Sequence, residues 1–417
     1  MLWEYFRNLI FNLLAKGDQF GVPQTALQSI QSVMLEFNDA FDYLPAKDAM
    51  SYLADDSNLE DKGLFILPAK GLKLDVDKEK AVANGIVDEK DADRMVDVMR
   101  WKIGKQTIFK ADLMILDMVA HFDWNRSIYF ASSASPSTYL GLTKYFFAEG
   151  LVYKMVPIEV KANRNPNSLG EVNKPKMYAN LMNIFHWGNM QEKGVLIDYY
   201  TRRLTNNYRV QFAVLADAYV EQIDQEKQKL EMLKQIQAQE GPEDQVVKTP
   251  LGNFVRAEVN EEIAKSKAVI DSNKVFVTQV LDKSNEVMPE FNVPYGRVIP
   301  SYISSYYAVG DEEKARMYTD RMLELFQEDI NYYLDIDPEF SSQMVQDIFD
   351  SYRGVFSLYQ ATQIYDTDPA YKDKVSNVFF DVSTKIQSGL NPIRKISPSA
   401  RNMIQNTFDK FFSQING

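Results

Sequence analysis

The sequence predicts an α+β fold, with a small mixed α/β domain over residues 1–175 and an all-α region over residues 176–417. Two observations carry this prediction. Short apolar and β-branched runs, which are typical of strands, occur before about residue 175. After that point apolar residues recur three or four positions apart over long stretches, as they do in amphipathic helices.

The first 55 residues predict helices. Apolar side chains in residues 1–15 recur with helical spacing, but charged and amide side chains interrupt the run, so it predicts neither a membrane span nor a signal peptide. We expect this amphipathic helix to pack on its own domain. Docking on a membrane or on a membrane domain is the alternative.

Strand signals follow in the rest of the first domain. Residues 110–122 are apolar on every side and predict a buried helix. Acidic residues open the segment 88–100, which predicts a short helix. The order of the remaining segments predicts a small, covered sheet. We expect strands over residues 63–74, 127–132 and 150–160, with a short helix over residues 139–149.

The second region predicts helical hairpins with tetratricopeptide-like character. Apolar residues spaced as in helices predict a long antiparallel hairpin at about 207–288, with a polar turn region over residues 241–252. The spacing of Tyr306, Gly310 and Ala315 resembles half of a tetratricopeptide repeat. Because the other positions of that pattern are not filled, we expect a few repeat-like helical pairs rather than a regular solenoid.

Composition excludes several classes of function. The net charge is −12, and no basic run is present to neutralise phosphates, so nucleic acid is not an expected partner. The chain has no cysteine and two histidines. Thiolate metal sites, cysteine nucleophiles and a conventional serine–histidine–aspartate triad therefore lack their residues. We expect no metal, no cofactor and no catalytic residue in this chain.

The run DWNRSIYF, residues 123–130, is the densest group of candidate binding residues. Arg126 can form a bidentate bond to a carboxylate or phosphate, and Trp124 and Tyr129 can stack on a sugar. Loop tips beside strands often carry function. The structural alternative is that Asp123 and Arg126 pair to fix the turn while Trp124 fills a core. The remaining candidate binding residues are Tyr139, His186 and Trp187. A lone histidine at a helix end is more often a partner of the helix dipole or a core residue than a ligand-binding residue.

Residues 123–158, DWNRSIYFASSASPSTYLGLTKYFFAEGLVYKMVPI, resemble a passage of large multi-span bacterial proteins. These form a family of unknown function with a protein O-mannosyltransferase-like membrane region. Ser127 stands where that family usually has proline. The similarity covers residues 40–220 and, more loosely, 285–335. The hairpin at 224–285 looks like an insertion relative to the family pattern.

The resemblance implies the C-terminal soluble region of such a protein. It implies that any site for a lipid-linked sugar donor and any catalytic carboxylate belong to the membrane part. We therefore expect a non-catalytic module that binds acceptor protein, glycan or a partner subunit. Its own membrane domain is one candidate partner. The expected location is the periplasmic side of the inner membrane or the soluble periplasm, with a cytoplasmic location left open. The alternatives are a free-standing helical-repeat scaffold for protein contact, or an independent hydrolase with a carboxylate pair across a cleft.

Overall fold

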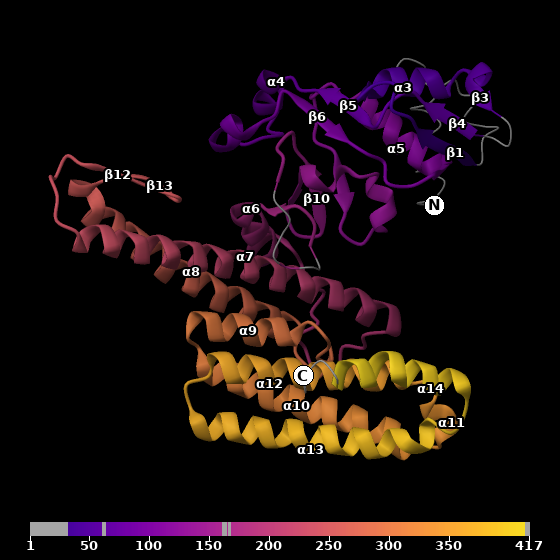
Figure 1. The fold of residues 1–417 in the computed structure, drawn as a ribbon, viewed down its shortest axis with the longest axis vertical. Helices are drawn as coiled ribbons and strands as arrows, with labels where there is room; N and C mark the ends of the chain where they lie inside the picture. The colour runs from indigo at the N-terminus through magenta and orange to yellow at the C-terminus, as the bar shows by residue number, and fades with distance from the viewer. Residues whose placement is uncertain (1–31, 61–63, 161–164, 166–167, 413–417) are drawn as a thin grey trace. The chain divides into compact units, whose positions relative to one another are not determined.

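The computed structural model describes residues 32–60, 64–160, 165 and 168–412. It confirms the predicted α+β class, with small sheets in the N-terminal part and long helices after them (Figure 1). The chain divides into two compact units, Met1–Leu181 and Met182–Gly417. The amphipathic helix expected over residues 1–15 lies outside the described residues.

The described part of the first unit contains three small sheets, where the sequence predicted one. The first sheet has the order β3 (Leu59–Glu60), β4 (Leu64–Leu67), β1 (Ser32–Phe37) and β7 (Thr107–Phe109). The second has the order β2 (Leu44–Pro45), β5 (Leu72–Asp75) and β6 (Val98–Trp101). The third has the order β11 (Glu171–Val172), β9 (Phe146–Ala148), β10 (Val152–Met155) and β8 (Tyr129–Ala131).

Two predicted helices of the first unit are wrong because strand pairing decides those segments. β1 lies in the stretch predicted as helical, but its side chains alternate in exposure, with Leu35 buried between exposed neighbours. The segment 88–100 splits into a 3₁₀ turn at Glu89–Arg94 and strand β6. In β6, Met99 and Trp101 are buried while the residue between them is exposed.

The helix expected over residues 139–149 is also wrong. Two 3₁₀ turns, Pro136–Tyr139 and Leu142–Tyr145, precede strand β9 instead. The break comes at Leu140 and Gly141, which both adopt left-handed backbone conformations with φ of 50° and 81°. A regular right-handed helix cannot pass through two such residues.

Four helices complete the described part of the first unit. The helix expected over residues 110–122 is present as α5, which buries Leu113, Leu116 and Val119 but leaves Met118 47% exposed. Asp77 caps α4 by accepting a hydrogen bond from the backbone N–H of Lys80. The helices are α3 (Ala46–Leu53), α4 (Lys78–Ala83), α5 (Lys110–Ala120) and α6 (Lys174–Ala179).

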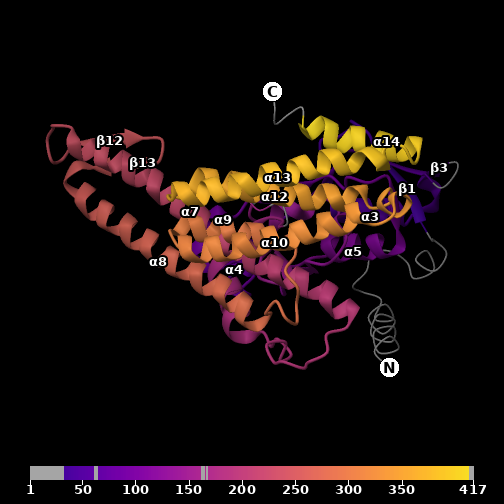
Figure 2. The same cartoon turned by 90° about the horizontal axis from the view of Figure 1, so that it is seen from below.

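A long antiparallel hairpin opens the second unit. It consists of α7 (Tyr199–Ala238) and α8 (Val259–Val287), which lie side by side in both views (Figures 1 and 2). The connection carries a β-hairpin of β12 (Val246–Thr249) and β13 (Gly252–Val255) where the sequence predicted a polar turn. Leu233, Ile236 and Val259 form a small buried cluster beneath this β-hairpin.

Four of the remaining helices pack in consecutive pairs, α9 against α10 and α12 against α13. Gly310, with φ of 84°, ends α9, and Asp311 caps α10 through the backbone N–H of Lys314. The segment that resembled half of a tetratricopeptide repeat is thus a helix–turn–helix with Ala315 fully buried. The helices are α9 (Ile299–Val309), α10 (Glu312–Asp335), α11 (Pro338–Ser341), α12 (Val345–Tyr365), α13 (Pro369–Ile393) and α14 (Pro398–Ile404).

Candidate functional site

Trp124 anchors the turn at residues 123–129. Its backbone is left-handed with φ of 63°, and its side chain is buried. The indole Nε1–H donates to the carbonyl of Asp75 at 3.2 Å, and the Trp124 carbonyl accepts from the Asn84 side chain at 3.0 Å. The indole also packs against Phe122, with ring centroids 4.6 Å apart. Trp124 therefore ties the turn to β5 and α4, and its ring is not open to a sugar.

The expected alternative pairing of Asp123 with Arg126 is absent. Asp123 instead accepts hydrogen bonds from the backbone N–H and the side chain of Asn125. Arg126 is exposed, and it makes no hydrogen bond or ion pair with any residue that the structure describes. A guanidinium presents five donors in a fixed planar fork. Arg126 is therefore free to meet an acceptor on a ligand.

Tyr129 lies on a face of the third sheet that carries charge. Tyr129 is 49% exposed. The strand register places Tyr129, Lys154, Phe147 and Glu171 in one row across the sheet, each directly opposite the next. Residues directly opposite one another on adjacent strands share one face of a sheet. Arg94 lies over the ring of Phe147 at 5.8 Å and forms a two-point ion pair with Glu171, with N–O distances of 2.5 and 3.0 Å.

Lys154 and Glu149 are buried charges beside Tyr129. Lys154 is 8% exposed, and its ammonium donates to the carbonyl of Gly85 at 2.7 Å. Glu149 is 4% exposed, and its carboxylate accepts from the Asn173 side chain at 3.2 Å. The two groups feel each other's charge, but they do not approach within the 4.0 Å of a salt bridge. We call Tyr129, Glu149 and Lys154 the Tyr129 cluster.

Burial is the main influence on each titration in the Tyr129 cluster. It raises the pKa of Glu149, and the positive charges of Lys154 and Lys176 oppose that rise. It lowers the pKa of Lys154, and the negative charges of Glu149 and Asp88 oppose that fall. The pKa of Tyr129 is raised by burial and then by the charge of Glu149. Each charge of the pair is thus only partly compensated, and perturbed pKa values of this kind cluster at functional sites as well as in structural charge networks.

Tyr139, a predicted binding residue, belongs to the aromatic core on the other face of this sheet. It is 1% exposed, and its hydroxyl donates to the carbonyls of Ala131 and Ala134 at 3.0 Å. Its ring meets Phe146 and Tyr153 edge-on at 5.5 and 5.8 Å. Burial raises the pKa of its hydroxyl to about 12. Tyr139 holds the fold behind the Tyr129 cluster.

His186 and Trp187 belong to the second unit. Trp187 is half-buried, with its ring centroid 5.3 Å from Phe212 and 5.9 Å from Tyr208 on α7. His186 is exposed. Trp187 therefore anchors its segment on α7, and the Tyr129 cluster is built without either residue.

Sequence reasoning missed Glu149 and Lys154. Both stand in the run FFAEGLVYKM, where the surrounding residues are apolar or small. Glutamate and lysine are almost never fully buried unless they are paired. Two charges inside a run that predicts covered strands were therefore the signal that could have found them.

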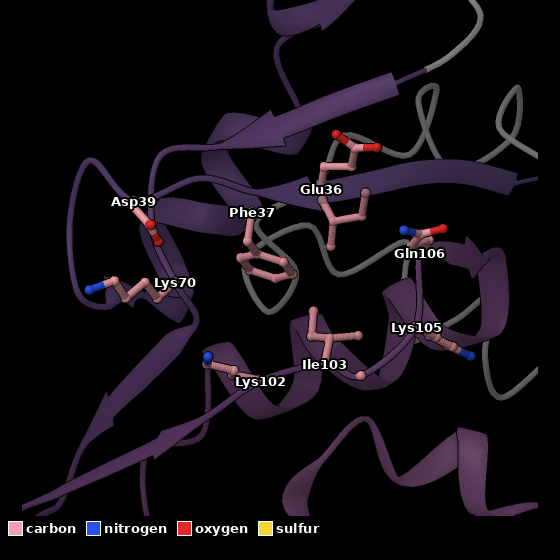
Figure 3. A pocket seen from close by; sticks show the side chains of 10 residues that line it. Glu36, Phe37, Asp39, Lys70, Lys102, Ile103, Lys105 and Gln106 are labelled. Carbon is pink, nitrogen blue, oxygen red and sulfur yellow. The ribbon is translucent and has the colours of Figure 1, made fainter.

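Hollows also lie elsewhere in the described residues. A groove lies beside β1 in the first unit (Figure 3), and its volume is about 1040 Å³. The second unit has a cavity of about 220 Å³ between α10, α12 and the segment before α9. Arg297 pairs with Asp350 in that cavity at 2.7 Å, and the carboxylates of Asp329 and Asp347 also line it.

Two kinds of feature are absent from the described part of the chain. No group of three or more histidine, aspartate or glutamate side chains there is arranged to hold a metal ion. Within the same residues, every helix is too short or too polar to cross a lipid bilayer.

The fold defines an α+β protein with a sheet-built first unit and a helical second unit. Comparison with known families gives a match over residues 14–176 to TMEM260-associated domain 2, a family linked to the protein O-mannosyltransferase-like TMEM260. The match covers the turn at residues 123–129 and the whole Tyr129 cluster. Comparisons with curated proteins and with solved structures gave no match.

Proposed function

We propose that this chain is a non-catalytic module of an O-mannosyltransferase-like membrane protein. In this proposal it lies on the periplasmic side of the membrane and binds acceptor protein, glycan or a partner subunit. Its own membrane domain is one candidate partner. The observation that carries the proposal is the match of residues 14–176 to TMEM260-associated domain 2. The likeness of residues 123–158 to bacterial proteins with an O-mannosyltransferase-like membrane region supports the same link.

The Tyr129 cluster and Arg126 supply the binding surface in this proposal. Tyrosine and arginine are enriched among the residues that dominate binding energy at interfaces. Arg126 has no described partner, and the Tyr129 ring is half exposed. Behind them, Glu149 and Lys154 are already removed from water. A ligand that supplies a donor to Glu149 or an acceptor to Lys154 therefore gains a strong hydrogen bond at little further desolvation cost.

The second candidate function is a free-standing scaffold for protein contact. The pairs α9–α10 and α12–α13 support it, as do large apolar side chains left exposed on them. Ile364 is 68% exposed and Phe380 57% exposed. This alternative predicts partners that bind the second unit and are indifferent to sugars.

The test is the size and location of the native polypeptide. Cells are separated into membrane, periplasmic and cytoplasmic fractions and blotted with an antibody against residues 32–181. The proposal predicts a membrane band well above the 48.0 kDa of this chain. A soluble band near that mass would overturn the membrane tether and leave the scaffold as the better account.

A second arm tests the binding surface. A photo-crosslinking amino acid replaces Arg126, and in the matched control it replaces Glu79, an exposed residue of α4. The proposal predicts a crosslinked partner from position 126 and none from position 79. Equal crosslinking from both positions would remove the Tyr129 cluster from the proposal.

A further inference from the structure

The groove of Figure 3 opens where two segments of the first unit separate. β7 pairs with β1 as far as Met34, and the backbone N–H of Leu35 then donates to the carbonyl of Gln106 at 2.6 Å. Beyond that bond β1 continues to Phe37 beside β4, while residues 102–106 take a different course. The space between them is the groove, with a volume of about 1040 Å³. Ligand sites of small molecules reach this size.

The wall formed by residues 102–106 is held by close backbone contacts. A Cβ atom on Gly141 would lie 1.8 Å from the carbonyl oxygen of Lys102, and one on Gly71 would lie 2.4 Å from that of Trp101. Both glycines therefore allow a neighbouring backbone to approach where any side chain would clash. A wall fixed in this way loses little conformational entropy when a ligand binds.

Polar groups gather at both ends of the groove, and apolar side chains lie between them (Figure 3). The middle is formed by Phe37, which is half-buried, and by Ile103 and Leu35, which are buried. Both ends therefore offer hydrogen-bond donors and acceptors together. One end carries Asp39, Lys70 and Lys102, and the other carries Lys105 and Gln106, whereas the Glu36 side chain points to the opposite side of β1 from Phe37.

The charges of the groove are balanced. The ammonium of Lys70 is 3.2 Å from Asp42, and that of Lys105 is 2.6 Å from Asp112. Lys102 has no ion-pair partner among the described residues, but the groove also carries the carboxylate of Asp39. The three cations are thus matched by carboxylates on or beside the groove. An anionic ligand would meet repulsion as well as attraction, so charge does not favour a phosphate or a sulfated chain.

We propose that this groove binds a neutral glycan. A hydroxyl group donates and accepts at once, which matches ends that offer carboxylate or amide acceptors beside ammonium and amide donors. The carbon-bound hydrogens of a sugar ring match the apolar middle formed by Phe37. The inference rests on the proposed function, of which it names the ligand class, and it adds a site separate from the Tyr129 cluster.

The test uses the purified 417-residue chain and four probes: mannotetraose, maltotetraose, tetragalacturonate and inorganic phosphate. Calorimetry measures affinity, and saturation-transfer NMR shows which sugar protons touch the protein. At least one neutral tetrasaccharide is expected to bind with a Kd at or below about 1 mM. Its affinity is expected to be unchanged by added salt, because no net charge is neutralised.

Variants locate the bound sugar. Asp39→Asn and Lys102→Ala change exposed residues and are expected to leave Tm unchanged. Phe37→Ala removes the half-buried aromatic ring from the middle of the groove. Each variant is expected to weaken tetrasaccharide binding about tenfold, which corresponds to a loss of about 1.4 kcal/mol of binding free energy. Phe41→Ala and Asp93→Asn change exposed residues outside the groove lining and are the controls, and they are expected to bind as the unmodified chain does.

Three results would overturn the inference. These are no binding of either neutral tetrasaccharide at about 1 mM, tighter binding of tetragalacturonate or phosphate, and binding that the groove variants leave unchanged. The fractionation experiment tests the proposed membrane tether, and its outcome is independent of these binding results. A soluble native chain that binds sugar in the groove would contradict the module, whereas a membrane-tethered chain that binds no sugar would contradict the groove alone.

Discussion

The two units bury charged side chains in different ways. In the second unit Arg209 is fully buried, and it donates to the carbonyls of Met288, Val293 and Pro294 at 2.6 to 2.7 Å. Met288 is the C-cap of α8, where the helix dipole is negative, and Val293 and Pro294 belong to the segment that follows. In the first unit the buried ammonium of Lys154 donates one hydrogen bond, to the carbonyl of Gly85, and Glu149 lies nearby without a salt bridge.

The difference separates a structural charge from a candidate site. Burial lowers the pKa of Arg209, but an arginine stays protonated in proteins, and three carbonyls accept from this one. The Arg209 Nε–H has no partner among the described residues, but the whole side chain is buried, so Arg209 holds the end of α8 and is closed to a ligand. Lys154 and Glu149 are left with capacity for further hydrogen bonds, and they lie beside the half-exposed Tyr129. A count of partners, rather than burial alone, therefore distinguishes the two regions.

The largest expected effect is on Arg209. Replacing it by methionine leaves two buried carbonyls and the partly buried carbonyl of Pro294 without a donor, so we expect Arg209→Met to lower the free energy of unfolding by roughly 3–5 kcal/mol. Denaturant unfolding followed by circular dichroism measures this. Arg202→Met changes an exposed arginine near the start of the same helix and is expected to stay within about 0.5 kcal/mol. A loss below about 1 kcal/mol for Arg209→Met would show that the charge is not structural.

The next effect concerns the wall of the groove. Gly141→Ala places a methyl group against the Lys102 carbonyl at a left-handed position, and we expect a loss of about 3 kcal/mol. Gly85 is also left-handed, with φ of 64°, but no atom lies within 4 Å of its added Cβ. Gly85→Ala should therefore cost only about 1 kcal/mol. Equal losses in thermal unfolding would mean that backbone contact does not fix residues 102–106.

A smaller effect, with a definite dependence on pH, is expected at Glu149. Its folded pKa is raised above the ordinary value of 4.5, so the folded chain takes up this proton first. The associated stability is fully present below the unfolded pKa and is lost as pH rises through the folded pKa. Glutamine resembles the protonated form, so Glu149→Gln should be more stable than the unmodified chain at pH 7.

The pH profile of unfolding checks this prediction. The advantage of Glu149→Gln is expected to shrink as pH falls and to vanish where Glu149 is protonated in both states. Asp198→Asn is the opposite control, because hydrogen bonds from Thr201 and Tyr200 hold the pKa of Asp198 below its usual range. That variant should lose stability at neutral pH. A Glu149→Gln variant less stable than the unmodified chain at pH 7 would mean that the charged form is favoured.

The smallest effect on stability is expected at Arg126. It is exposed and without a described partner, so Arg126→Ala should change the free energy of unfolding by less than about 0.5 kcal/mol. The same variant should weaken capture of the crosslinked partner seen from neighbouring positions of the turn. Denaturant unfolding and crosslinking yield are measured together. A clear loss of stability would assign Arg126 to the fold rather than to the binding surface.

The sequence foretold the fold class because its two periods of apolar residues differ on either side of about residue 175. It also foretold α5 and the helices α7 and α8, where helical spacing runs on for many turns. It failed where pairing between distant segments decides the structure. β1 and β6 are strands because they form hydrogen bonds with other strands. The residues around Leu140 do not predict its left-handed backbone conformation.

The sequence singled out some residues of the candidate site, whose binding role stays a prediction. The turn at residues 123–129 was singled out, and the exposed Arg126 and half-exposed Tyr129 keep a binding role open there. Trp124 and Tyr139 carry the same aromatic chemistry but are buried, and aromatic residues look alike in a sequence whichever way they face. Glu149 and Lys154 were missed because their closeness depends on the turn between β9 and β10.

The most direct measurement of the contrast between the two units is the titration of Lys154 by ¹³Cε NMR in selectively labelled protein. The incompletely compensated pair predicts a midpoint below the ordinary 10.5, because burial lowers the pKa of Lys154 more than Glu149 raises it. In Glu149→Gln the midpoint should fall further, since the opposing negative charge is gone. A midpoint at or above 10.5, unmoved by Glu149→Gln, would contradict the account and place Lys154 beside Arg209 as a structural charge.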